Sequence, residues 1–289
     1  MRHTRSCVDV NLATGRSGCQ LDLGKIRAII IVPHGQILQL WDNNILTNKQ
    51  LVRARVHTNE PFRIFPINGI VDYAKSGGEP QVSAVGYDGN GVTGISARTD
   101  TFTLSKYSEH IAASLTKNMN KRFDVYYVDE NNVMYGIQKD GQLYGFPMLT
   151  IYTNATPHPT SSAQATMTIS CCLENAREAI ECFDYHELKG EILDELEGLV
   201  PVDLVETATT GKYKVVETIG GYDRTAEFGA VTAQSLAGLF NGITAASYEN
   251  GLLTLTAEQG VTPSIKAASV LFAAGITHIE YNTTVPKAS

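Results

Sequence analysis

The sequence predicts a mainly β fold, a β-sandwich or half-barrel with one flanking helix, followed by a small α+β domain. Short segments that alternate apolar and polar residues, separated by glycine-containing turns, dominate residues 1–200. A single long segment in that range has the three- and four-residue spacing of an amphipathic helix. From about residue 205, short strands alternate with helices. We therefore expect a β-rich domain at residues 1–200 and a small α+β domain at residues 205–289.

Composition supports a folded protein of two domains. The chain has 289 residues, of which 43% are hydrophobic and 18% charged, so there is apolar surface for packed cores and too little charge for a disordered chain. The longest aliphatic run, Ala28–Val32, is far shorter than the roughly 18 to 20 apolar residues of a membrane-spanning helix. The segment Cys7–Leu12 is charged where a signal peptide would be apolar, so we expect the chain to fold where it is made.

The first hundred residues predict a β meander. Gly35 can take the positive φ of a tight reversal, so the segments on either side of His34 and Gly35 are expected to form a hairpin. Further strands are expected wherever apolar and polar residues alternate, and glycine-rich turns are expected at 75–78 and 87–91. The expected strands are 25–33, 36–41, 51–57, 62–67, 82–85 and 92–95.

One helix is expected next, near residues 105–119. Its apolar residues recur at helical steps, and Ser108 stands where an N-cap is needed. Hairpins with turns at 129–132 and 139–141 follow, and a loop rich in Thr, Pro and Ser covers 153–163. The acidic stretch 174–198 suggests at least one short amphipathic helix, and a linker containing Pro201 ends this part. The expected strands are 123–128, 133–137, 143–146, 148–152 and 165–171.

The C-terminal part reads as a compact α+β module. Strands are expected at 212–218, 252–256 and 276–281, and helices at 232–240 and 264–274. Gly275 is placed to end the second helix.

Charge is unevenly distributed along the chain. The net charge of −7 argues against general affinity for nucleic acid, which requires clustered Lys and Arg. Residues 1–60 contain eight basic and four acidic residues, whereas 174–206 contain eleven acidic and two basic ones. Such polarity suits head-to-tail or ring assembly, although solvated faces are the commoner reason for charge runs.

The five cysteines do not form a disulfide framework. We expect reduced thiols, with Cys171 and Cys172 on opposite faces of a strand. Cys7 and Cys19 bracket a glycine-containing segment and could close a loop under oxidising conditions.

No residue is nominated as catalytic, cofactor-binding or metal-binding, and no cofactor and no enzyme activity are expected. The seven histidines show no ligand spacing. Cys182, Asp184 and His186, with Glu187 beside them, would share a strand face but are interpreted as a solvated acidic stretch. Segments 86–91, 94–98 and 129–132 are interpreted as turns and strand rather than a phosphate loop, a nucleophile elbow or a calcium loop. A carboxylate pair for glycoside hydrolysis stays open, because separation in space is not readable from sequence.

Two stretches resemble known proteins. The first runs from Cys7 through Gly15 and Cys19 to Leu23–Ile31, and the second combines Phe123–Gly136 with Leu143–Phe146. Together they resemble tail-tube-like virion proteins of tailed phages that infect gut Bacteroidetes.

The resemblance implies a virion structural protein assembled in the host cytoplasm. Its copies would form rings, by this resemblance hexamers, that stack with other virion proteins into a hollow tube. DNA would pass through the tube, typically acidic inside, without specific binding. The hairpin at about 72–98 would be the contact arm between rings. The module after residue 205 departs from a minimal tube subunit and leaves a collar, neck, baseplate or fibre component open.

Two other classes remain as alternatives. A glycan-binding adhesion module would share the strands and turns, but usually carries a secretion signal. An enzyme such as a glycosidase or peptidase would need a nucleophile or carboxylate pair that the sequence does not display. Particle size in solution separates these classes from an assembling subunit.

Overall fold

The computed structural model describes residues 23–38, 48–59, 61–84, 86–161, 164–188 and 192–282. The chain divides into two compact units. The first lies within residues 1–55 and 61–197, and the second consists of residues 56–60 together with 198–289. Both units are built around a sheet, and the predicted mainly β fold class is confirmed.

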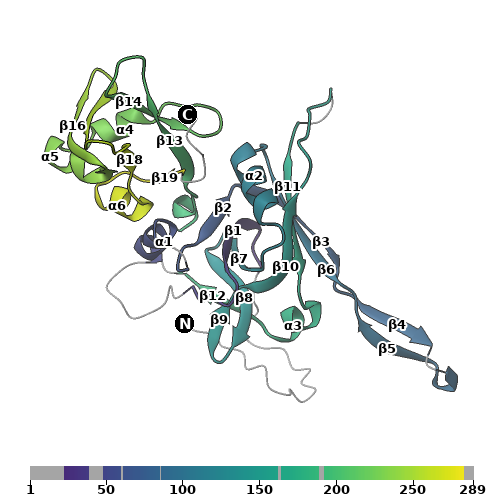
Figure 1. The fold of residues 1–289 in the computed structure, drawn as a ribbon. Coiled ribbons are helices and arrows are strands. Elements are labelled where there is room, and N and C mark those ends of the chain that lie inside the picture. The colour runs from purple at the N-terminus through teal and green to yellow at the C-terminus, as the bar shows by residue number, and fades with distance from the viewer. Residues whose placement is uncertain are drawn as a thin grey trace. The chain divides into compact units, whose positions relative to one another are not determined.

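The first unit is a large antiparallel sheet of ten strands (Figure 1). Its main path runs in the order β12-β8-β7-β10-β11-β6-β3, while β1, β2 and β9 branch from it. Most of the expected strands from 123 to 171 are therefore present. The strands are β1 Ile26–Pro33, β2 Phe65–Asn68, β3 Ile70–Gly77, β6 Arg98–Leu104, β7 Phe123–Asp129, β8 Val133–Lys139, β9 Gln142–Tyr144, β10 Phe146–Thr153, β11 Met167–Leu173 and β12 Phe183–Glu187.

Strand β7 is the branch point of this sheet. One edge of β7 pairs with β1 along its length, whereas the other edge is shared, with Val125 opposite Phe146 of β10 and Tyr127 opposite Tyr135 of β8. Glycine makes the crowding possible, because a Cβ at Gly145 would lie 2.8 Å from the Val125 nitrogen. The sheet can therefore split and close around a core instead of remaining flat.

Aromatic side chains fill the core of the first unit. The ring of Tyr127 lies 5.0 Å from that of Phe102 in an edge-on arrangement and 4.8 Å from that of Phe146. Helix α2, Glu109–Asn118, lies where the helical spacing predicted a helix, and it packs the buried Ala112 and the partly buried Ile111 and Leu115 against this core. Ser108 is the N-cap in extended conformation, but its side chain makes no capping hydrogen bond.

The second unit is a mixed half-barrel sheet of five strands in the order β16-β17-β14-β13-β19. Only β13 and β19 are parallel neighbours in this sheet. Short helices bury Phe228, Leu236 and Leu271 against its inner face. Its elements are β13 Val200–Glu206, β14 Lys212–Glu217, α4 Thr225–Gly229, α5 Ala233–Leu236, η3 Ala237–Leu239, β15 Phe240–Asn241, β16 Ile243–Glu249, β17 Leu252–Ala257, β18 Ser264–Ile265, α6 Ala268–Ala273 and β19 Ile279–Tyr281.

The prediction of a strand at 51–57 is wrong, because this segment lies in helix α1, Asn48–Val56. The alternation of apolar and polar residues that suggested a strand also places Val52 and Val56 four residues apart, which puts them on one face of a helix. Both side chains are buried, with exposed fractions of 0% and 1%, so the helical period prevails over the strand period.

The hairpin expected around Gly35 is also absent from the described residues. Gly35 has the predicted positive φ of 78°, but residues 36–38 are not a strand, and 39–41 lie outside the described residues. The buried carboxylate of Asp124 holds this turn instead, accepting from the Gly35 nitrogen at 2.8 Å and contacting His34 Nδ1 at 2.8 Å. Strand β1 pairs with β7 and β2.

Three further boundaries differ from the sequence-based expectations. Pro201 is the second residue of β13 and does not lie in a linker; its carbonyl accepts from the Thr218 nitrogen at 2.9 Å, one residue before the β13–β14 register begins at Val202. The segment expected as a helix from 264 begins with β18, so α6 starts only at Ala268. The acidic stretch contains the expected short helix as α3, Ala176–Glu181, but it continues as strand β12 and the 3₁₀ turn η2, Leu193–Glu195.

Residues 56–60 belong to the second unit, which the sequence did not predict. The ring of His57 stacks on Phe272 with centroids 4.4 Å apart, and its Nε2 accepts a hydrogen bond of 3.0 Å from the His278 nitrogen. His57 has an exposed fraction of 1%, so this short segment is part of the packed interior of the unit.

The cysteines follow the sequence-based expectation in part. Cys171 is buried and Cys172 partly exposed, as expected for opposite faces of β11, and both are free. Cys182 is disulfide-bonded, so the expectation of reduced thiols is wrong at this position. Cys7 and Cys19 lie outside the described residues.

Gly136 should be intolerant of a side chain. A Cβ at this position would lie 2.0 Å from the carbonyl oxygen of Tyr144, so G136A should lower the free energy of unfolding by about 1–3 kcal/mol through overpacking. G94A is the matched control, because a Cβ there meets open space. Denaturant unfolding of both variants tests this, and equal stability of G136A and G94A would contradict the close approach of β8 and β9 at Gly136.

The carboxylate of Asp223 should stabilise the second unit at neutral pH. Hydrogen bonds from Lys214 and Thr225 lower the pKa of Asp223 to about 2, so its stabilisation is present above the ordinary pKa of about 4 and is lost as the pH falls toward 2. D223N should therefore flatten the fall in unfolding free energy between these pH values, whereas E258Q, in an exposed turn, should not. If the unfolding free energy of D223N fell between about pH 4 and pH 2 as steeply as that of the unmodified chain, the stabilising role of Asp223 would be contradicted.

Candidate functional site

The candidate site is a projecting arm of the first unit. Strands β3 and β6 leave the body of the unit and continue as β4, Pro80–Ala84, and β5, Asn90–Ile95, which pair in a separate two-stranded ribbon. The tip is the 3₁₀ turn η1, Gly86–Asp88, where the sequence predicted a turn. Figure 1 shows β4 and β5 extending well beyond the other strands of this unit. We call residues 70–104 the arm and residues 80–95 its outer part.

The outer part of the arm has an exposed apolar face. Val82 pairs directly with Val92, and Pro80 with Ile95, so these four side chains share one side of the ribbon. Val82 and Val92 are 58% and 68% exposed, and Tyr87 at the tip is fully exposed. The only charged residue between positions 80 and 95 is Asp88. Solvent-exposed apolar residues on a ribbon with two open edges indicate a surface that binds another strand or sheet.

An elbow separates the outer ribbon from β3 and β6. Gly77 and Gly78 both have positive φ, of 75° and 79°, and a Cβ at Gly77 would lie 1.9 Å from the Ala97 oxygen. Across the elbow, the backbone nitrogen and the hydroxyl of Ser96 donate to the Glu79 carbonyl at 3.0 and 3.2 Å, and the same hydroxyl oxygen accepts from the Glu79 nitrogen at 3.1 Å. Only glycine fits such a close approach of two strands, so the change of direction is built into the sequence.

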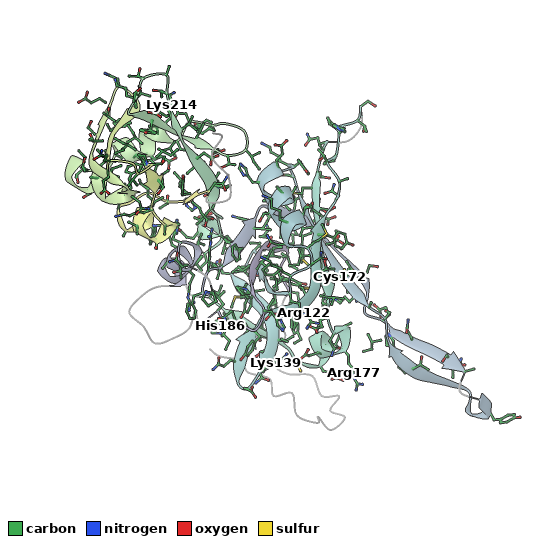
Figure 2. All side chains as sticks on the ribbon, in the orientation of Figure 1. Arg122, Lys139, Cys172, Arg177, His186 and Lys214 are labelled. Carbon is green, nitrogen blue, oxygen red and sulfur yellow. The ribbon has the colours of Figure 1, made fainter. Side chains whose placement is uncertain are left out.

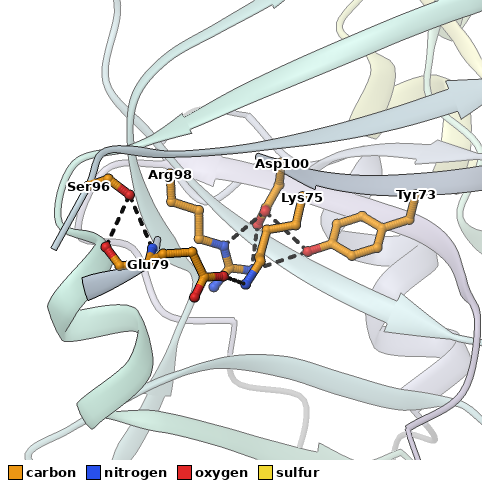
Figure 3. Close-up of polar contacts among 6 residues, drawn as sticks. All are labelled: Tyr73, Lys75, Glu79, Ser96, Arg98 and Asp100. Carbon is orange, nitrogen blue, oxygen red and sulfur yellow. Dashed lines mark hydrogen bonds and ion pairs between the residues drawn. The ribbon is translucent and has the colours of Figure 1, made fainter. Parts of the chain in front are cut away.

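A buried polar cluster holds the root of the arm (Figure 3). The guanidinium of Arg98 forms two hydrogen bonds with Asp100, from Nε at 2.9 Å and from Nη2 at 2.8 Å. The hydroxyl of Tyr73 donates to Asp100 at 3.1 Å, and that of Tyr127 in β7 donates to it at 2.7 Å. Asp100 is fully buried, while the side chain of Arg98 is 16% exposed. The cluster thus connects both strands of the arm to the central strand of the sheet.

Burial perturbs the ionisation of the groups around this carboxylate. Burial first, and then the charge of Asp100, raises the pKa of Tyr73 to about 12, and the same two causes raise the pKa of Tyr127. Burial would lower the pKa of Arg98, but the hydrogen bond and charge of Asp100 raise it. Arg98 and the tyrosine hydroxyls therefore remain hydrogen-bond donors to Asp100 over the whole physiological pH range.

The acidic stretch is partly neutralised within the first unit. Glu174 pairs with Arg122 at 3.0 Å, and Glu178 pairs with Lys139 at 2.8 Å; Figure 2 labels both bases. Glu195, 7% exposed at its side chain, is bound by both ends of the Arg53 guanidinium. Acids and bases that are far apart in sequence thus meet inside one copy, and fewer acids are left for contacts between copies than the sequence suggested.

Two of the other segments weighed in the sequence contain a buried carboxylate, Asp129 and Asp184. Asp129 accepts from the Gly24, Asn131 and Val133 nitrogens at 2.8–3.1 Å and from the Tyr135 hydroxyl, which satisfies its buried carboxylate in the expected turn. Asp184 is buried in β12 rather than solvated. Within the described ranges there is no group of three or more potential metal ligands, and none of the helices could cross a membrane.

Sequence reasoning did not identify the Arg98–Asp100 pair. The signal was present, because an arginine and an aspartate two residues apart on an alternating strand share a face. The local pattern does not show that this face is buried, and only the structure shows that Tyr73 and Tyr127 cover it.

Comparison with known protein families and with curated proteins finds no match to this chain. The fold and the arm therefore define a class by geometry alone, that of a sheet protein with a projecting, uncharged β-ribbon.

Removing the carboxylate at the arm root should be costly. D100A leaves the Arg98 guanidinium buried without its partner and should lower the free energy of unfolding by about 3–5 kcal/mol. E79A removes the exposed Lys75–Glu79 pair and should change the free energy of unfolding by less than about 1 kcal/mol. Denaturant unfolding measures both, and hydrogen exchange across residues 70–104 should be faster in D100A alone. Equal stability of the two variants would refute the role of the cluster.

Proposed function

We propose that this chain is a structural subunit of a tailed-phage virion, a tail-tube-like protein whose copies assemble into stacked rings around a DNA conduit. In this proposal the chain is not an enzyme and requires no cofactor. Its partners are further copies, in a ring that the resemblance suggests is a hexamer, and other virion proteins. DNA passes the subunit without specific contacts, in agreement with the net charge of −7.

The outer arm is the observation that carries the proposal. A two-stranded ribbon is marginally stable in water by itself, and this one exposes Val82, Val92 and Tyr87. Natural edges are usually protected by charge, whereas here only Asp88 is charged between positions 80 and 95. Such a ribbon is stabilised when it binds to another copy, and closed symmetry removes the remaining open edges.

The resemblance at Cys7–Ile31 and Phe123–Phe146 supports the assignment to phage tails. The second of these segments contains β7, β8 and β9, the branch of the large sheet from which the arm root is held. The second unit leaves room for a collar, neck or baseplate position, and electron microscopy of the particles distinguishes these positions from a tube.

Shortening the arm should abolish assembly without unfolding the subunit. Glu79 and Ser96 are already hydrogen-bonded partners, so residues 80–95 can be replaced by Asn-Gly, which closes a two-residue hairpin turn. The full chain should form rings or tubes in light scattering and electron microscopy. The shortened variant should be monomeric, with denaturant unfolding like that of the full chain.

Two outcomes would overturn the proposal. The full chain could remain a monomer at all concentrations, and a monomer that binds sugars would favour the adhesion class. Alternatively, the shortened variant could form the same particles as the full chain, and the arm would then have no part in assembly.

A further inference from the structure

The second unit has an open sheet edge that resembles the arm in its lack of charge. Strand β16, Ile243–Glu249, is the end strand of the five-stranded sheet. It carries no charged side chain before Glu249. Thr244 and Ala245 are both exposed. The backbone groups along the outer edge of such a strand can bind a further strand.

The other end strands of the described sheets are protected. Strand β3 carries Asp72 and Lys75, and β12 carries Asp184 and Glu187. Strand β2 has four residues and includes Pro66, and β9 and β19 have three residues each. Charge, proline and shortness are the usual devices that prevent strands from pairing with other molecules. Within the parts of the chain that the structure describes, the long edges without a charged residue in their middle are thus those of β16, whose one charge is the terminal Glu249, and of the outer arm.

Strand β16 pairs with β17 and with no second strand among the described residues, and helices α4 and α5 lie close to it. The Tyr248 ring lies against Gly229 of α4, where an added Cβ would be 2.3 Å from the ring. Pairing with β17 runs from Ile243 to Glu249, interrupted by an irregularity between Ile243 and Ala245. A strand added at the free edge would therefore extend an ordered, anchored sheet.

We propose that the outer arm of one copy adds to strand β16 of a second copy, so that the C-terminal unit is the receptor for the arm. Strands β4 and β5 have five and six residues, which matches the seven of β16. When a strand is added to a sheet edge, main-chain hydrogen bonds supply the affinity, and the one charged side chain on the two edges is the exposed Glu249 at the end of β16. The inference rests on the proposed function in taking the arm as the assembly element.

Donor and receptor are different parts of the same chain, so the contact is heterologous. Each copy can donate one arm and accept another, which generates closed rings or open chains rather than isolated dimers. This gives the second unit a direct role in assembly.

A lysine on the receptor edge tests the proposal. Ala245 is exposed, so A245K should fold normally but place a charge on the edge that the arm must approach. We expect loss of all particles larger than one chain in light scattering, at concentrations where the unmodified chain assembles. Q259K adds the same charge in an exposed turn and should assemble normally. T244K serves as a second edge variant should A245K unfold.

A mixing experiment makes the test specific. The shortened-arm variant keeps the receptor, and A245K keeps the arm, so neither should assemble alone. Mixed in equal amounts, they should form a dimer of one copy of each, which stops there because each has lost its other partner site. Sedimentation velocity measures this dimer.

The outcomes separate this inference from the proposed function. Normal assembly of the shortened-arm variant would overturn the role of the arm altogether. Loss of assembly in that variant, together with normal assembly of A245K and T244K, would overturn only the role of β16 and would favour pairing between arms. Absence of the mixed dimer, when both variants are folded monomers, would also overturn the inference.

Discussion

The ion pair between Arg98 and Asp100 is the contact on which the arm depends. A ribbon that leaves the body of a protein has few neighbours, so its direction must be set at the point where it leaves. Here a fully buried carboxylate accepts from Arg98 in the same strand, from Tyr73 in the partner strand and from Tyr127 in β7. Removing two charges from water is costly, and the cost is offset only because several donors surround the carboxylate. The cluster thus fixes both arm strands to the core.

The core and the arm are parts of one arrangement. The ring of Tyr127 packs between Phe102 and Phe146, and its hydroxyl donates a hydrogen bond to Asp100. One side chain therefore contributes both to the core and to the arm root. Beyond the root, tandem glycines at the elbow release the ribbon from the sheet. The buried carboxylates of Asp100 and Asp129 are thus satisfied by several donors each, while the strands of the outer arm carry no charged residue and expose apolar side chains. This division suits a subunit whose binding energy is realised between copies.

Much of the fold was predictable from local pattern, and the failures have physical causes. The hairpins from Phe123 to Phe146 were predicted from short runs of β-branched and aromatic residues separated by the turn residues at 129–132 and 139–141, and the structure has them. Residues 51–57 satisfy both the strand and the helix period, and the buried pair Val52 and Val56 decides for the helix. Contacts between residues far apart in sequence left no local signal, as for His57 with His278. At the candidate site the turn at the tip was predictable, but the burial of Asp100 was not.

The five residues around His57 that complete the second unit have a consequence for its ancestry. A segment that could be copied between genes as one block would have to bring its whole interior with it. This unit takes an aromatic ring of its interior from position 57, some 140 residues upstream of the remainder. Residues 198–289 alone therefore lack part of the interior of this unit. A recombination event at position 198 would separate Phe272 from the His57 ring on which it stacks.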